Sequence, residues 1–190
     1  MMRTILMTLA LVVSMAVGAQ SAETLYKQGK ALYEAKNYKQ AFPKLKAAAE
    51  KGHKKAQYRL ARCYDKGHGT AENETEAFKW YMKAAAQDHA KSQYQVGKCY
   101  KDGKGTAKDR QKAVQYFAKA AKQDNADGQY QLGKAYMKGK GIATDEKKAR
   151  YWLRKAITNP KDGADILAKV KKDAASGDED AKRILTLIKR

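Results

Sequence analysis

Apolar residues recur along this chain at the spacing of an α-helix. In the segment that begins at residue 56, Ala56, Leu60, Ala61 and Tyr64 lie at i, i+4, i+5 and i+8 and therefore share one helical face. A second amphipathic segment follows, and most of its apolar positions are alanines, whose small side chains let two helices approach closely. These positions are Ala77, Tyr81, Ala84 and Ala85. The pattern predicts a pair of antiparallel helices.

The predicted helix pair is repeated with an offset of 36 residues. The three copies begin at residues 56, 92 and 128. Matching residues in the first helix of each copy are Gln57, Gln93 and Gln129; Tyr58, Tyr94 and Tyr130; Leu60, Val96 and Leu132; and Tyr64, Tyr100 and Tyr136. Matching residues in the second helix are Ala77, Ala113 and Ala149; Trp80, Tyr116 and Trp152; and Lys83, Lys119 and Lys155.

Each copy has a pair of glycines between its two helices. The pairs are Gly67 and Gly69, Gly103 and Gly105, and Gly139 and Gly141. Glycine accepts the left-handed conformation at a helix end, so these residues predict a turn. A phosphate-binding loop would need a preceding strand and a G-K-[ST] ending, which the pairs lack. Asn73, Asp109 and Asp145 come just before the second helices, where short polar side chains cap free backbone N–H groups.

The copies share the pattern A-x-x-x-L-x-x-x-Y-x-x-G-x-G, followed by N/D-x-x-x-A-x-x-W-Y-x-K-A-A. This pattern resembles the Sel-1-like repeat family, a branch of the tetratricopeptide-like helical solenoids, closely over residues 56–158. The resemblance implies an all-α fold, an α-solenoid of antiparallel helix pairs. It also implies that the first helix of each pair lines a concave surface, and that the protein holds other proteins rather than catalysing a reaction.

The flanking segments differ from the three copies. Residues before the first copy form a shorter helix pair without the glycine insertion, closer to a plain tetratricopeptide repeat. Residues after the last copy carry apolar stripes at Ile166 and Ile184, as expected of the atypical helices that cap a solenoid. The predicted organisation is a signal peptide at 1–22, an N-terminal helix pair at 23–55, repeats at 56–91, 92–127 and 128–159, and capping helices at 160–190.

The N-terminal segment has the pattern of a secretory signal peptide. Arg3 precedes an apolar run from Ile5 to Val17, and small residues follow it. The run has 13 residues, too few to span a bilayer comfortably. Cleavage after Ala19 or Ala22 fits the small residues there, and a buried N-terminal helix is the alternative. We therefore expect an exported protein, periplasmic as first choice and secreted as second.

Charge suggests which partner an exported repeat protein would bind. Lys and Arg number 40 against 20 Asp and Glu, a formal net charge of +20. If the first helices line a groove, they present tyrosines beside cations one turn further on. These are Tyr26 with Lys30, Tyr58 with Arg62, Tyr94 with Lys98, and Tyr130 with Lys134, with Lys55 and Lys91 extending the cations. Such a column suits an acidic protein or peptide. The alternative is that the tyrosines are packing residues and the lysines a solvated face.

The remaining reactive residues fit a structural role better than a chemical one. Cys63 and Cys99 share a repeat position that Ala31 and Ala135 also occupy, which indicates a small packing slot. Stacked helices lie about 9 Å apart and a disulfide needs Cα atoms within about 7 Å, so free thiols are expected and a Cys63–Cys99 disulfide is the alternative.

No metal, cofactor or catalytic residue is expected. The three histidines lack partners at metal-ligand spacing, and no nucleophile stands beside a base. Two further functions stay open. The charge would also suit an anionic envelope polymer or nucleic acid, although the lysines are spread over all repeats. Remotely, the family resemblance allows a β-lactamase-like hydrolase, because cysteine-rich members have been linked to that activity.

Overall fold

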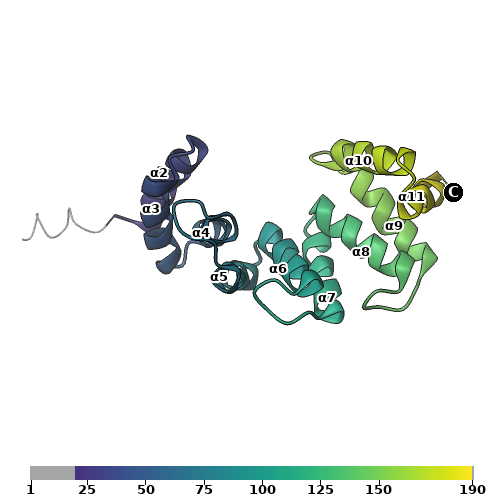
Figure 1. Cartoon of the computed structure of the whole chain (residues 1–190), viewed down its shortest axis with the longest axis horizontal. Coiled ribbons are helices and arrows are strands. Elements are labelled where there is room, and N and C mark those ends of the chain that lie inside the picture. The colour runs from purple at the N-terminus through teal and green to yellow at the C-terminus, as the bar shows by residue number, and fades with distance from the viewer. Residues whose placement is uncertain (1–19, 190) are drawn as a thin grey trace, which may run out of the picture. The chain divides into compact units, whose positions relative to one another are not determined.

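The computed structural model describes residues 20–189, and these fold into ten α-helices with no strand among them (Figure 1). This confirms the all-α prediction. The helices are α2 (Ala22–Glu34), α3 (Tyr38–Glu50), α4 (Lys54–Lys66), α5 (Glu74–Ala86), α6 (Ala90–Asp102), α7 (Arg110–Lys122), α8 (Ala126–Lys138), α9 (Glu146–Ile157), α10 (Gly163–Ala175) and α11 (Glu179–Lys189). The predicted signal peptide lies almost wholly outside the described residues; α2 begins at Ala22, the last residue of that segment. No helix in 20–189 is long and apolar enough to cross a membrane.

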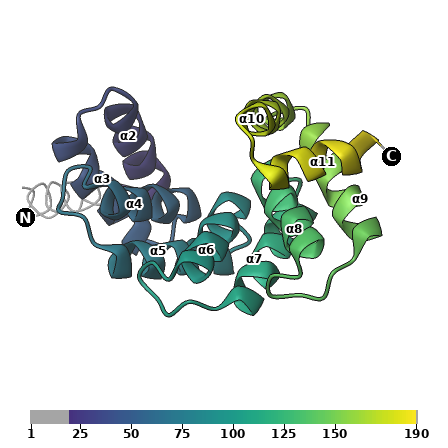
Figure 2. The same cartoon turned by 45° about the vertical axis from the view of Figure 1, so that its right-hand side comes forward.

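The chain divides into two compact units, Met1–Glu72 and Asn73–Arg190. In the first unit, α3 packs against both α2 and α4. In the second unit, α5 packs on α6, α6 on α7, α7 on α8, and α8 on α9, so each helix lies against the next in the chain. The last two helices pack on each other and on α9, and they lie beside α8 and α9 in Figures 1 and 2. Consecutive packing of this kind is the solenoid arrangement that the repeat predicts.

Side-chain caps fix where the second helix of each repeat begins. The side chains of Asn73, Asp109 and Asp145 each accept a hydrogen bond of 2.9 Å from the backbone N–H three residues further on. Each of these residues is the N-cap of its helix, as the sequence predicts. The cap removes one of the unpaired donors that every helix N-terminus carries.

Two histidines stand at helix starts. His53 and His89 are the N-caps of α4 and α6, the first helices of two consecutive repeats. The Nδ1 atom of His53 accepts the backbone N–H of Ala56 at 3.1 Å. A histidine ring nitrogen can therefore replace the usual short polar cap, a role that helix periodicity alone does not reveal.

The cap at Asp109 makes stability depend on pH. The backbone N–H of Lys112 is the main cause that lowers the pKa of Asp109. A carboxyl whose pKa is lower in the folded chain stabilises the fold above its unfolded pKa of about 3.9, and this stabilisation is lost as the pH falls through the folded pKa. The Asp109→Asn variant keeps a cap of the Asn73 type but cannot titrate. Its melting temperature should fall less than that of wild type between about pH 4 and about pH 2, measured by circular dichroism. Parallel curves for the two proteins would contradict this role.

Buried glutamines tie consecutive helices together. Gln57, Gln93 and Gln129 donate their side-chain amides to the carbonyls of Ala49, Ala85 and Ala121, at 3.2, 3.4 and 3.4 Å. The Gln93 side-chain oxygen accepts a further bond of 2.7 Å from Gln123. In the last repeat the position of Gln123 is taken by Asn159, one methylene shorter, which donates to the Asp124 carbonyl instead. The buried Gln129 oxygen then has no hydrogen-bond partner among the described residues.

Two apolar clusters lie in the described part of the second unit. One surrounds Phe117 and Leu132, and the other surrounds Leu153, Val170 and Ile184. The second cluster joins α9 to the two C-terminal helices, so these helices cover the end of the repeat array. The apolar faces of α10 and α11 are buried in this cluster.

Candidate partner-binding site

In the first unit, the predicted column of tyrosines and cations does not form an open surface. Tyr26 is buried, and its ring stacks on the His53 ring with centroids 4.3 Å apart. Lys30 pairs with Glu34 at 3.7 Å. The Arg62 guanidinium lies over Tyr33, 6.0 Å from the ring centroid. The packing alternative therefore describes Tyr26 correctly, because the histidine that caps α4 covers it.

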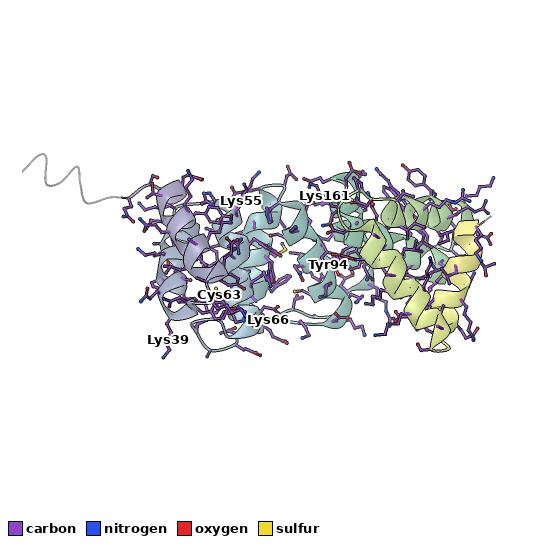
Figure 3. The ribbon with its side chains drawn as sticks, turned by 90° about the horizontal axis from the view of Figure 1, so that it is seen from above. Lys39, Lys55, Cys63, Lys66, Tyr94 and Lys161 are labelled. Carbon is purple, nitrogen blue, oxygen red and sulfur yellow. The ribbon has the colours of Figure 1, made fainter. Side chains whose placement is uncertain are left out.

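Two further predicted residues of the first unit differ in exposure. Tyr58 is half-buried and Lys55 is exposed. Figure 3 shows Lys39, outside the predicted set, reaching away from the helices, whereas Cys63 lies among them. The first unit thus carries exposed cations, but its tyrosines do not supply a continuous contact surface.

In the second unit, the predicted pairs of tyrosine and lysine do form. The Lys98 ammonium lies 5.8 Å from the centre of the Tyr94 ring, and the Lys134 ammonium lies 5.5 Å from that of Tyr130. All four side chains are half-buried, whereas Lys91 is exposed. The i, i+4 spacing on one helix face brings each cation over its ring, where the negative face of the ring attracts it.

The two tyrosines of these pairs differ in their surroundings. Tyr94 packs against Phe117, with ring centroids 6.0 Å apart. Tyr130 packs against the apolar cluster of the C-terminal helices. Burial, assisted by the negative charges of Asp173, Asp178 and Asp180, raises the pKa of Tyr130 to about 12. Tyr130 is therefore largely a packing residue, and Tyr94 keeps the stronger claim to contact a partner.

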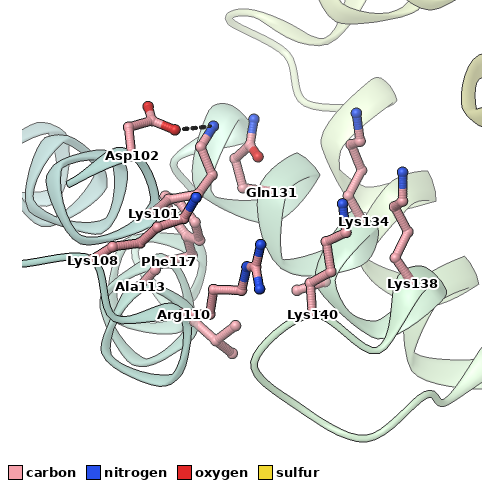
Figure 4. Close-up of a pocket in the computed structure, with 12 residues that line it drawn as sticks. Lys101, Asp102, Lys108, Arg110, Ala113, Phe117, Gln131, Lys134, Lys138 and Lys140 are labelled. Carbon is pink, nitrogen blue, oxygen red and sulfur yellow. Dashed lines mark ion pairs between the residues drawn. The ribbon is translucent and has the colours of Figure 1, made fainter.

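A basic pocket of about 310 Å³ lies beside Lys134 (Figure 4). Its cationic lining residues are Lys101, Lys108, Arg110, Lys134, Lys138 and Lys140. The apolar lining residues are Ala113, Val114, Phe117 and Ala135, and Asp102 and Gln131 complete the wall. Figure 4 shows Arg110 between two groups of lysines, Lys101 with Lys108 on one side and the other three on the opposite side.

Three stretches of chain supply the pocket's cations. Lys101 lies in the last turn of α6, and Lys108 and Arg110 lie where the following turn enters α7. Lys134 and Lys138 stand one turn apart on α8, and Lys140 is in the turn after it. Helices α7 and α8 pack together, so the apolar floor and the charged rim come from one packed core.

Only part of the pocket's charge is neutralised within the protein. Lys101 pairs with Asp102 at 3.6 Å, and Lys138 pairs with Asp180 of α11. Within residues 20–189, no carboxylate lies within 4.0 Å of the charged atoms of the other four cations, Lys108, Arg110, Lys134 and Lys140. Burial lowers the pKa of Lys134, opposed by the charge of Asp180. A concave site with surplus positive charge attracts anions.

Of these six cations, only Lys134 was predicted from the sequence, because the prediction used residues on the faces of the first helices. The other five cations lie in or next to the inter-helix turns. The sequence signal for these five cations is the basic character of two stretches that were predicted as turns, KDGKGTAKDR at 101–110 and KGK at 138–140.

The cysteines show no sign of chemistry. Neither cysteine forms a disulfide within residues 20–189; Cys63 is buried and Cys99 is half-buried. Burial raises the pKa of the Cys63 thiol to about 11, which keeps it protonated and unreactive at neutral pH. Among the described residues no group of three His, Cys, Asp or Glu side chains could hold a metal ion. His68 instead stacks on Tyr38, with ring centroids 3.9 Å apart.

The fold and the repeated helix pairs are those of a helical repeat protein. The sequence model of the Sel1 repeat matches residues 54–89, 90–125 and 126–159. The chain therefore belongs to the Sel1 repeat family. Proteins of this family are generally non-catalytic scaffolds that typically mediate protein–protein interactions. No curated protein matches the chain.

Two solved structures show the same fold. A Sel1 repeat protein from Oxalobacter formigenes is 32% identical, with a TM-score of 0.69 over 85% of this chain and 67% of that protein. The protective antigen c5321 of uropathogenic Escherichia coli, which displays the same repeat fold, is 28% identical, with a TM-score of 0.72 over 91% of this chain. The present chain covers 42% of the length of that antigen.

Proposed function

We propose that this protein is an exported scaffold that binds a protein partner through the basic surface of its second unit. We define the basic surface as Tyr94, Lys98, Lys134 and the basic pocket beside them. The observation that carries the proposal is the pocket, where four cations that have no carboxylate partner within residues 20–189 stand around an apolar floor. Surface charge of one sign steers an oppositely charged partner, and apolar contact adds affinity after encounter.

Three further observations support export and protein binding. The signal-peptide pattern at 1–22 favours export. One structural relative is a protective antigen of a pathogenic bacterium, and exposure to the outside of the cell would suit such a role. Membership of the Sel1 repeat family favours a protein partner over a small substrate.

The proposal predicts that the Tyr94→Ala/Lys98→Ala variant loses partner binding. The variant removes a rigid aromatic contact and one charge, which should lower partner recovery about 10-fold. The measurement is quantitative mass spectrometry of proteins that co-purify with a tagged bait from the cell envelope. The intact mass of the bait shows whether residues up to Ala19 or Ala22 have been removed. An uncleaved bait in the cytoplasm would contradict export.

The matched control is Lys147→Ala/Tyr151→Ala on α9. It removes the same two residue types at the same spacing, and Tyr151 is 56% exposed. Circular dichroism should show equal helicity for both variants. Equal recovery of the same partners by the test variant, the control variant and wild type would contradict the binding proposal.

A further inference from the structure

The cations and apolar floor of the basic pocket specify the chemistry of its ligand. Six cations and one carboxylate line the pocket, so the site favours an anionic ligand. Five of the cations are lysines, which act as point charges, and only Arg110 offers the planar fork that grips a phosphate or carboxylate at two points. The cations also stand on opposite sides of the pocket in Figure 4. This arrangement suits several separate anionic groups rather than one compact group.

The floor adds a second requirement. Phe117 and Val114 line the bottom of the pocket and are 3% and 8% exposed, so the floor presents a small apolar surface that belongs to the packed core. A volume of about 310 Å³ is at the lower end of the range for ligand sites, which begins at about 300 Å³. An apolar side chain fits such a floor while its chain neighbours reach the rim. A uniformly charged polymer would leave the apolar surface uncovered.

A carboxylate that does not line the pocket already contacts one of its lysines. Asp180, from α11, forms an ion pair with Lys138, and the pair lowers the pKa of Asp180. Asp178 and Asp180 also act electrostatically on Lys134. Carboxylates carried by a polypeptide can therefore reach the pocket's lysines from outside α8.

We infer that the basic pocket binds an acidic peptide segment of the partner, with an apolar side chain on Phe117 and flanking carboxylates on Lys108, Arg110, Lys134 and Lys140. This inference rests on the proposed function, because it names the part of the partner that the basic surface recognises. The apolar side chain occupies the pocket and sets the register of the peptide, and the cations supply charge-assisted hydrogen bonds.

The test uses the full exported chain and a labelled synthetic peptide in which one phenylalanine is flanked by aspartates and glutamates. Fluorescence polarisation measures its affinity for wild type and for a Lys108→Gln/Arg110→Gln/Lys140→Gln variant. These side chains are exposed, so the variant should fold. Its affinity should be lower by about 10-fold or more, because three charge-assisted contacts are lost. The control variant Lys122→Gln/Lys147→Gln/Lys172→Gln has the same net charge and should bind about as tightly as wild type.

Two altered ligands complete the test. A peptide with asparagine and glutamine in place of the acids, and a peptide with serine in place of phenylalanine, should both bind more weakly than the parent. Equal affinity of the parent peptide for both triple variants would overturn the inference. An oligothymidylate that binds more tightly than the peptide and loses affinity in the pocket variant would also overturn it, in favour of an anionic polymer. Failure of the labelled peptide to bind wild type, while the Tyr94→Ala/Lys98→Ala variant still recovers less of its partner, would contradict the pocket inference and leave the proposed function standing.

Discussion

Replacing Gly105 with alanine is expected to destabilise the second unit by about 3 kcal/mol or more. A Cβ atom at this position would stand 2.1 Å from the carbonyl oxygen of Glu74 and 2.6 Å from its carbonyl carbon. Both are backbone atoms in the first residue of α5, so no side-chain rotation relieves the clash. The residue also has φ +66°, which alanine rarely adopts. Either the turn or the start of α5 has to move.

Gly103 is the matched control in the same turn. It has φ +79° and ends α6, but the nearest atom to an added Cβ is the Lys108 Cβ at 3.5 Å, an ordinary contact. Alanine there should cost only the backbone strain, about 1–2 kcal/mol. Urea unfolding followed by circular dichroism gives the free energy of unfolding of both variants. Equal losses would show that backbone strain alone, and not the contact with Glu74, governs this turn.

Leu153→Ala should destabilise the second unit by about 2–5 kcal/mol, the usual range for a fully buried leucine. Leu153 is 0% exposed and belongs to the cluster that holds α10 and α11. Its side chain packs closely against Gly133: a Cβ atom added to that glycine would lie only 2.7 Å from Leu153 Cγ. Truncation leaves a cavity between α8 and α9 that rigid helix backbones fill poorly.

Tyr151→Ala, two residues earlier on the same helix, is the control. Tyr151 is 56% exposed, so its loss should change the free energy of unfolding by about 0.5 kcal/mol or less. Both variants are compared by urea unfolding. A small loss for Leu153→Ala would mean that the C-terminal helices do not depend on this cluster.

The helices and their starts could be predicted from sequence because their causes are local. A helix needs an apolar face at regular spacing and a capping side chain near its start, and both lie within a few residues of each other. Asn73, Asp109 and Asp145 therefore appear as caps in the sequence and in the structure. Three copies of one pattern strengthened each assignment, since an accidental match would not recur at the same offset.

The site was harder to predict because equivalent residues meet different surroundings. Tyr94 and Tyr130 share one repeat position, yet the C-terminal helices bury Tyr130 against a second cluster. The sequence pattern places Tyr26 in the same row of tyrosines, but in the structure the His53 ring stacks on Tyr26 and covers it. Repeat alignment shows which positions correspond, but not which neighbour packs on each.

Local periodicity and composition are enough to establish the helix pairs, their order and the surplus of positive charge. Where that charge gathers depends on how the helices pack. Lys108, Lys134 and Lys140 come from separate stretches, and the packing of α7 against α8 brings them to one pocket over Phe117. Tertiary structure also decided that Asp180 neutralises Lys138 and that Gly105 touches the backbone of α5. Contacts between residues distant in the chain depend on packing distances of a few ångströms, which no local pattern encodes.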